Sequence, residues 1–428
     1  MSELPSGWDW TTIGEATEVV LGQSPPGSSY NDAGAGLPFF QGKAEFGELH
    51  PTVVKWTTAP KKVAEVNDVL LSVRAPVGPT NLAPTTCSIG RGLAALRGTS
   101  AVDHRYLLWW MRASTDQLAS RATGSTFTAV SGAQVRAHPI PLAPRAEQER
   151  IVAAIEEHLS RLDAAESVLT SAEERVAVLA QTGVRQLFES RPWPWKTLAE
   201  IAEIKGGVTK DSKRQSDPSF VEVPYLRVAN VQRGRLDLSE VTTIRVHPDK
   251  AKALRLEPGD VLLNEGGDRD KLGRGWVWEG EVADCIHQNH VFRARLNDDF
   301  DPYFVSTHAN TWGQAWFEEH GRQTTNLASI NLGTLRQLPV PAPPRSEQEV
   351  IVAELQASSE AQRRLLASID HAQSRARALR RSILAAAFSG HLVPQDPEDE
   401  PASVLLDRIR SERAAAAPTK RTRKVKTS

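Results

Sequence analysis

The chain has 428 residues, with 51 Lys or Arg against 52 Asp or Glu, so its formal net charge is −1 at pH 7. This length predicts about two to four domains, and 40% hydrophobic with 24% charged residues excludes a mostly disordered chain. The balanced charge excludes a uniformly basic, non-specific nucleic-acid binder. The sequence has no run of about 18 apolar residues, so it predicts no membrane span.

The first residues and the cysteines both favour the cytoplasm. The N-terminal residues lack the basic and apolar segments of a signal peptide. The two cysteines, Cys87 and Cys285, exclude a disulfide scaffold and a four-cysteine zinc site. Because unpaired thiols fit a reducing compartment, we expect a cytoplasmic protein without a membrane partner.

Residues 1–145 are expected to form a first globular domain. Short strand-like runs, such as 53–56 and 69–73, lie between Gly, Pro, Asn and Asp residues that break strands. Residues 104–121 have the apolar spacing of an amphipathic helix. The pattern predicts a mixed α/β domain.

Residues 146–190 predict one long helix. They contain no proline and a single glycine, Gly183, and Glu147 lies in the first turn, where the helix dipole favours a carboxylate. The spacing of the apolar residues is close to seven, which is typical of a coiled coil. The expected seam is Ile155, Leu162, Leu169 and Val176.

The second half of the chain follows the same plan. Residues 191–345 predict a second mixed α/β domain, with strand-like residues at 221–228 and an amphipathic helix at 302–320. Residues 346–390 predict a second long helix, and residues 391–428 a basic, partly disordered tail. The expected seam of the second helix is Leu355, Leu365, Ile369, Leu379 and Ile383.

A tandem repeat underlies this plan. The pattern Pro-x-Pro-x-x-Pro-Arg-x-Glu-Gln-Glu occupies residues 139–149 and again residues 339–349, whereas the middles of the two domains diverge. A lone helix with one apolar seam is not stable. We therefore expect an α+β fold in which the two helices pair within the chain as an antiparallel coiled coil under a pseudo-two-fold. Two separate helical hairpins and a homodimeric coiled coil are the alternatives.

Motifs of catalysis and of metal binding are weak. The chain has no Asn/Asp-Pro-Pro-aromatic motif of an adenine methyltransferase and no glycine-rich nucleotide turn. Residues 36–43 resemble a phosphate loop in composition, but the spacing and Ala44 do not fit one. Cys285, His287 and His290 have the residue types of a zinc site but alternate along a predicted strand and lack a fourth ligand. We predict no catalytic residue and no metal.

Polar loops are the candidates for contact with DNA. The glycine-rich segment 264–275 follows a predicted strand and carries cations that suit phosphates or guanine edges. Loops at 123–126 and 322–326 occupy the same place in the two domains. The alternatives are a solvated turn and a brace for the helix junction. The candidate residues are Arg74, Arg91, Ser125, Thr126, Lys210, Lys213, Arg214, Arg269, Lys271, Arg274, Arg322 and Thr325.

Two divergent domains, each followed by the Pro-rich motif and a long helix, resemble the specificity subunit of a type I restriction-modification enzyme. Residues 225–231, residues 266–271 and the Trp-x-Trp start of each domain also resemble target recognition domains of that family. The similarity covers about residues 4–413. The resemblance implies that each domain binds one half of a bipartite target in double-stranded DNA. It also implies that the coiled coil sets the spacer and docks two methyltransferase subunits, which restriction and translocase subunits join.

The resemblance further implies that this chain binds no cofactor. S-adenosylmethionine, ATP and magnesium would belong to the partner subunits, which methylate adenine and cleave DNA. The alternatives are a recognition subunit of a related DNA-modifying defence system, a coiled-coil scaffold that does not bind DNA, and an enzyme built from unmatched residues.

Overall fold

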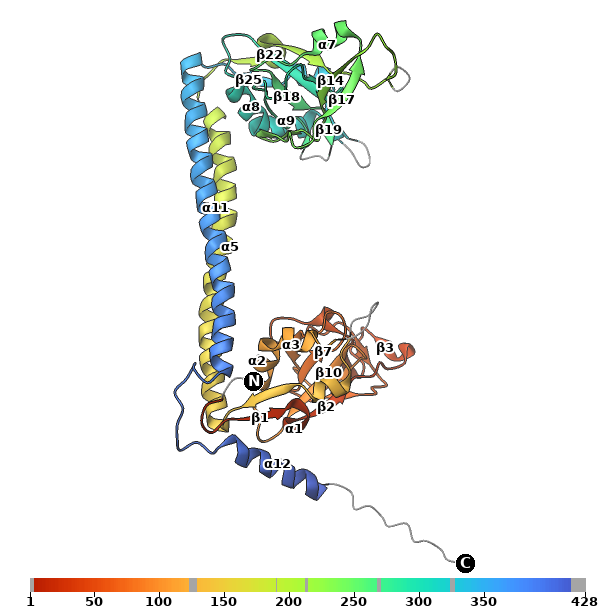
Figure 1. The fold of residues 1–428 in the computed structure, drawn as a ribbon, viewed down its shortest axis with the longest axis vertical. Coiled ribbons are helices and arrows are strands. Elements are labelled where there is room, and N and C mark those ends of the chain that lie inside the picture. The colour runs from red at the N-terminus through yellow and green to blue at the C-terminus, as the bar shows by residue number, and fades with distance from the viewer. Residues whose placement is uncertain are drawn as a thin grey trace, which may run out of the picture. The chain divides into compact units, whose positions relative to one another are not determined.

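The computed structural model describes residues 4–122, 129–189, 191–211, 215–267, 271–323 and 328–416. The chain divides into unit 1, Met1–Val168 with Ala372–Ser428, and unit 2, Leu169–His371. Both long helices, α5 (Arg145–Glu189) and α11 (Arg345–Phe388), contribute to both units. Sheets and helices are mixed, as the expected α+β class requires (Figure 1).

The central antiparallel sheet of unit 1 has the order β2-β10-β7-β8, and a second sheet has the order β3-β5-β4-β9-β6. The strands are β1 (Asp9–Thr12), β2 (Thr17–Leu21), β3 (Tyr30–Asn31), β4 (Leu37–Phe40), β5 (Trp56–Thr57), β6 (Val63–Ala64), β7 (Val69–Ser72), β8 (Thr80–Leu82), β9 (Cys87–Ile89), β10 (Leu93–Gly98) and β11 (Pro139–Leu142). The helices are α1 (Ile13–Ala16), η1 (Gly27–Ser29), η2 (Lys43–Glu45), α2 (His104–Ala113), α3 (Thr115–Ala119) and α4 (Gly132–Arg136).

Strand β7 is buried along its whole length because the unit covers both of its faces. Val69 and Leu71 pack into the cluster that contains Tyr106 of α2. Leu70 packs on the other face, with Phe40 of β4. A strand covered on both faces is a continuous apolar run rather than an alternating one, which explains its sequence.

Unit 2 repeats the central sheet in the order β13-β22-β18-β20. Its strands are β12 (Trp195–Thr197), β13 (Ala202–Gly206), β14 (Val221–Leu226), β15 (Val231–Gln232), β16 (Arg235–Leu236), β17 (Thr242–Val246), β18 (Val261–Asn264), β19 (Gly266–Gly267), β20 (Gly275–Val277), β21 (Ile286–His287), β22 (Val291–Leu296), β23 (Arg322–Gln323), β24 (Ala328–Ser329) and β25 (Pro339–Pro341). Its helices are α6 (Leu198–Ile201), α7 (Pro248–Leu254), α8 (Pro302–Asn310), α9 (Trp312–His320) and α10 (Leu332–Arg336).

The repeat extends to single ion pairs. In unit 1, Arg97 of β10 pairs with the buried carboxylate of Asp68, just before β7, at 3.0 Å. In unit 2, Arg295 of β22 pairs with the buried Asp260, just before β18, at 2.8 Å. The duplication seen in the sequence is therefore also a duplication of architecture.

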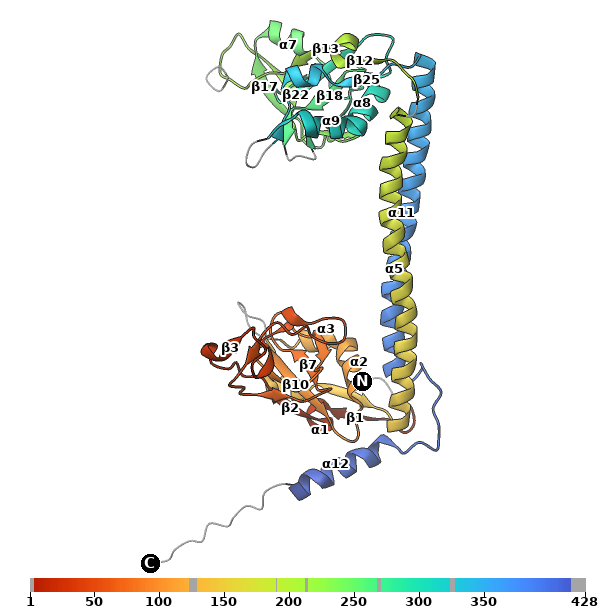
Figure 2. The same ribbon diagram turned by 180° about the vertical axis from the view of Figure 1, so that it is seen from behind.

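Helices α5 and α11 lie side by side in both views (Figures 1 and 2). In unit 1 the start of α5 packs on the end of α11, because Ile155 and Ile383 share one buried cluster. Arg380 of α11 also pairs with Asp163 and, at 3.3 Å, with Glu166 of α5. The helices are thus antiparallel partners within the chain, as expected.

The expected seam of α5 is at least partly buried at every position, and Ile369 and Ile383 of α11 are buried. The expectation that Leu365 and Leu379 of α11 lie in the seam is wrong, because they are 48% and 51% exposed. The partly buried positions are one residue later, at Leu366 and Arg380. Hydrophobicity alone would place Leu379 in the seam. In the structure Arg380 occupies that seam position, because acidic residues of α5 neutralise its charge.

The last part of the chain also differs from the expected tail. Residues 402–416 form helix α12 (Ala402–Ala416), and its apolar face is buried in the core of unit 1. That face has the helical spacing of an amphipathic helix and consists of Ala402, Leu405, Leu406 and Ile409. Arg413 anchors it by donating to the backbone carbonyls of Gly14 and Thr17, each at 3.0 Å. Residues 417–428 lie outside the described residues. No helix within the described part of the chain is long and apolar enough to cross a membrane.

Candidate nucleic-acid interface

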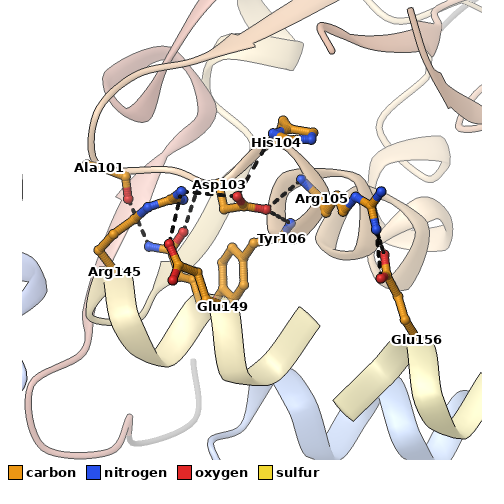
Figure 3. A network of polar contacts seen from close by, with 9 residues as sticks. Ala101, Asp103, His104, Arg105, Tyr106, Arg145, Glu149 and Glu156 are labelled. Carbon is orange, nitrogen blue, oxygen red and sulfur yellow. Dashed lines mark hydrogen bonds and ion pairs between the residues drawn. The ribbon is translucent and has the colours of Figure 1, made fainter. Parts of the chain in front are cut away.

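Polar contacts between Arg145 and Asp103 fasten the start of α5 to the start of α2 (Figure 3). Asp103 caps α2 by accepting hydrogen bonds from the backbone N–H groups of Arg105 and Tyr106, at 2.8 and 3.1 Å. Arg145, the first residue of α5, pairs with the same carboxylate at 3.1 Å. Burial alone would raise the pKa of Asp103, but these N–H groups and the guanidinium hold that pKa below its ordinary value.

Gln148 completes this attachment of α5 to α2. We call the attachment, which consists of Asp103, Arg145 and Gln148 in unit 1, the clamp. Its side-chain oxygen accepts a hydrogen bond from the backbone N–H of Asp103 at 2.9 Å. Its amide nitrogen donates to the carbonyls of Ala101 and Ala143, at 2.8 and 2.9 Å. Because the side chain is fully buried, these three bonds are all made away from water.

Unit 2 contains the same clamp. Asp301 caps α8, and Arg345 of α11 pairs with its carboxylate at 3.1 Å. The Gln348 side chain accepts from the Asp301 N–H at 2.8 Å and donates to the carbonyls of Asp299 and Pro343, each at 2.9 Å. The repeated motif is therefore a joint between a domain and its long helix.

The first glutamate of the motif differs between the units. Glu147 is buried and accepts a hydrogen bond from the Trp8 indole at 2.9 Å. Burial raises the pKa of Glu147, and the Trp8 bond only partly opposes this shift. In unit 2, Glu347 instead forms an ion pair of 2.9 Å with Arg191 at the surface.

A phenylalanine near the C-terminal end of each long helix packs that end against a helix of a globular domain. Phe388 of α11 packs against Tyr106 and Trp110 of α2, with ring centroids 5.2 and 5.1 Å apart. Phe188 of α5 packs against Phe304 of α8 at 5.6 Å. Each unit therefore holds the start of one long helix and the end of the other.

In unit 2 the structure joins the two loops that the sequence suggested separately. Strand β19, in the glycine-rich segment, pairs with β24, and β24 pairs with β23, which begins with the exposed Arg322. The backbone N–H of Ile330 also donates to the carbonyl of Glu265 at 2.7 Å. The described start of the glycine-rich segment, Gly266–Gly267, and the described start of the second loop, Arg322–Gln323, thus belong to one small sheet.

The two described cations of the glycine-rich segment are only partly exposed. Arg274 is partly buried and donates to the Val228 carbonyl at 3.5 Å, so it braces the loop. Lys271 is also partly buried. The candidates that lie outside the described residues are Ser125, Thr126, Lys213, Arg214, Arg269 and Thr325.

Unit 1 has the corresponding surface. Arg74, two residues after the end of β7, pairs with Ala129 through an isolated antiparallel β-bridge of the backbone. The neighbouring Val73 donates its backbone N–H to the carbonyl of Gly92 at 2.9 Å, which brings Arg74 beside the turn that carries Arg91. Both arginines are exposed. Two candidates far apart in sequence therefore lie at the same end of the central sheet.

The same backbone contact exists in unit 2, where Glu265 donates its N–H to the carbonyl of His290 at 2.9 Å. The backbone N–H of the adjacent Asn289 donates to the carbonyl of Val208, also at 2.9 Å. The exposed Lys210 lies two residues after Val208. Sequence reasoning missed Asn289 and Glu265. Their only signal in the sequence is the Cys-x-His-x-x-His stretch, whose residue types suggest a metal site instead.

The side chains of Cys285, His287 and His290 do not come together as ligands of one metal site. Cys285 and His287 are buried, and burial lowers the pKa of His287 to about 4. His290 instead contacts Glu265. Among the described residues no group of three or more His, Cys, Asp or Glu is arranged to hold a metal ion.

The family model for the type I restriction modification DNA specificity domain matches twice, at residues 5–171 and 191–369. The chain belongs to this family. Its two matched segments contain the two recognition domains with their duplicated clamps. This identification agrees with the resemblance inferred from the repeats.

Several specificity subunits are similar to this chain. The putative type I restriction enzyme MjaX specificity subunit of Methanocaldococcus jannaschii is 39% identical over 154 residues, which cover 35% of this chain and 36% of the relative. The EcoKI specificity subunit of Escherichia coli K12 is 23% identical over 368 residues, covering 80% and 78%. The chain thus spans about a third of the archaeal relative and most of the bacterial one.

Solved structures share the fold. One chain, from work on complex assembly and conformational transition of the type I R-M system, superposes with a TM-score of 0.73 at 21% identity, covering 91% of this chain and all of that one. The HsdS subunit of Thermoanaerobacter tengcongensis gives a TM-score of 0.60 at 22% identity, covering 91% and 98%. At these identities the likeness establishes the fold alone.

Proposed function

We propose that the chain is the DNA sequence-specificity subunit of a type I restriction-modification complex, in which each recognition domain binds one half of a bipartite target. The observation that carries this proposal is the duplicated end of the central sheet. In both units, the segment that follows β7 or β18 lies beside a tight turn, and the two together carry polar side chains that are at least partly exposed, namely Arg74 and Arg91 in unit 1 and Glu265, Asn289 and His290 in unit 2. Proteins read base edges with side chains of this kind held on a rigid scaffold.

The long helices set the spacer between the half-sites. Each unit holds both helices, one by its buried glutamine clamp and the other by its terminal phenylalanine. Because neither helix end is loose, helix length determines the separation of the two half-sites on DNA.

The coiled coil also docks the methyltransferase subunits. Helix α5 exposes Val168, Val178 and Leu179 by 68%, 61% and 69%. We expect a partner subunit to cover these apolar side chains in the complex. Catalysis, S-adenosylmethionine, ATP and magnesium belong to the partner subunits in the cytoplasm, and this chain supplies recognition only.

Methylome sequencing of a host that expresses the chain with its methyltransferase subunits tests the proposal. The expected result is adenine methylation at one bipartite sequence, lost when the chain is omitted. Methylation that persists without the chain, or a complex that does not bind the enriched duplex in a gel shift, contradicts the proposal and favours a scaffold.

A further inference from the structure

One turn is closed by the same backbone hydrogen bond in both units but carries different side chains. It runs over residues 288–291 before β22 and over residues 90–93 before β10. Each turn is closed by a hydrogen bond from the backbone N–H of its last residue to the carbonyl of its first, at 2.9 and 3.0 Å. The second residue of the turn is Asn289 in unit 2 and Arg91 in unit 1.

Backbone contacts fix both turns to the central sheet. In unit 2, the carbonyl of His290 accepts from Glu265 after β18. In unit 1, the carbonyl of Gly92 accepts from Val73 after β7. Both bonds are 2.9 Å long. The side chain of the second residue of each turn is therefore presented by a rigid frame, beside the segment that follows β7 or β18.

His290 and Glu265 orient the amide of Asn289. The amide nitrogen of Asn289 lies 3.1 Å from Nε2 of His290, and Nδ1 of His290 contacts the Glu265 carboxylate. An amide nitrogen only donates and a carboxylate only accepts, so Nε2 of His290 accepts from the Asn289 amide and the N–H at Nδ1 donates to Glu265. The remaining N–H and the oxygen of the Asn289 amide bond to no residue that the structure describes.

This chemistry suits a base edge better than a phosphate. The Glu265 carboxylate beside the turn repels phosphate, whereas an oriented amide offers one donor and one acceptor. That pair matches N7 and the N6 amino group of adenine in the major groove. In unit 1, no described residue bonds to the Arg91 guanidinium, whose two parallel donors match O6 and N7 of guanine.

We propose that this turn is a base-reading element of both recognition domains. Asn289 reads an adenine in one half-site, and Arg91 reads a guanine in the other. His290 and Glu265 are positioning residues that act through Asn289. The inference rests on the proposed function, because it requires each domain to read one half-site.

Methylome sequencing of the whole complex tests the inference by single substitutions. Asn289→Ala is expected to relax one adenine position of one half-site, with discrimination reduced by about tenfold or more, and to leave the other half-site unchanged. Arg91→Ala is expected to relax one guanine position of the other half-site. Glu265→Gln is expected to weaken discrimination at the Asn289 position only, which a loss of folding would not do.

The matched control is Asn297→Ala, an exposed asparagine beyond the opposite end of β22, which is expected to leave both half-sites unchanged. If Asn289→Ala abolishes all methylation, the isosteric Asn289→Asp decides, and it too must lose the adenine preference. A wild-type complex with a bipartite target that Asn289→Ala and Arg91→Ala leave intact overturns the inference alone. A wild-type complex without a bipartite target overturns the proposed function as well.

Discussion

The side-chain oxygen of Gln148 accepts a hydrogen bond from the backbone N–H of Asp103, 2.9 Å away, and so ties the first turn of α5 to the first turn of α2. Gln348 and Asp301 make the same contact in unit 2, at 2.8 Å. The repeated motif thus has a mechanical reason. A recognition domain can diverge in its loops, while its attachment to the long helix stays the same.

Gln148→Ala is expected to destabilise unit 1, because it leaves the Asp103 N–H and two carbonyls buried without partners. A buried group left unsatisfied costs about 1–3 kcal/mol. Urea unfolding followed by circular dichroism measures the loss. Glu149→Ala, which removes only an exposed ion pair with Arg145, is the control and should change the stability by less than about 1 kcal/mol. Equal effects of the two variants would refute the clamp.

Glu147→Gln is expected to stabilise the protein at neutral pH. The pKa of Glu147 in the fold is raised by burial, so its favourable contribution is present below the ordinary glutamate pKa and is lost as the pH rises through the raised value. Glutamine removes the charge and still accepts from Trp8. Thermal unfolding between pH 4 and pH 8 should show a gain that shrinks toward acid. The control Glu347→Gln should show no such gain, and a pH-independent gain for Glu147→Gln would contradict this account.

Ile369→Ala and Leu379→Ala separate the true seam of α11 from the one that hydrophobicity suggests. Ile369 is buried, and its truncation should cost about 2–5 kcal/mol. Leu379 is half-exposed, so its truncation should cost well under 1 kcal/mol in the isolated chain. Chemical denaturation of both variants decides the register, and a larger loss for Leu379→Ala would show that the seam is misassigned.

These residues show what the sequence predicts and what it does not. The seven-residue spacing locates Ile155 and Ile369 correctly, because burial of apolar side chains dominates there. It fails at Arg380, since an ion pair with Asp163 and Glu166 lets a charged residue occupy the seam. The recognition surface is harder still. Glu265 and His290 lie 25 residues apart, and only the pairing of β18 with β22 brings them together.

Adding one heptad to both long helices, at facing positions, is expected to abolish methylation at the original spacer. Seven residues lengthen each helix by about 10 Å while keeping the seam in register. The control is an insertion of four residues after Glu189. It should keep the original spacer, because Phe188 still anchors the end of α5 and the helix length is unchanged. Methylome sequencing of both variants checks the ruler, which would be wrong if the lengthened coiled coil kept the original spacer.

The central claim is that each recognition domain reads one half of the target independently, on a shared pair of helices. Methylome sequencing of a chimaera tests it most directly. In the chimaera, residues 1–145 are exchanged for the first domain of another specificity subunit, up to and including the arginine of the clamp. The account predicts a new sequence in one half-site, with the other half-site and the spacer unchanged. A chimaera that methylates adenine but changes both half-sites, or neither, would contradict it.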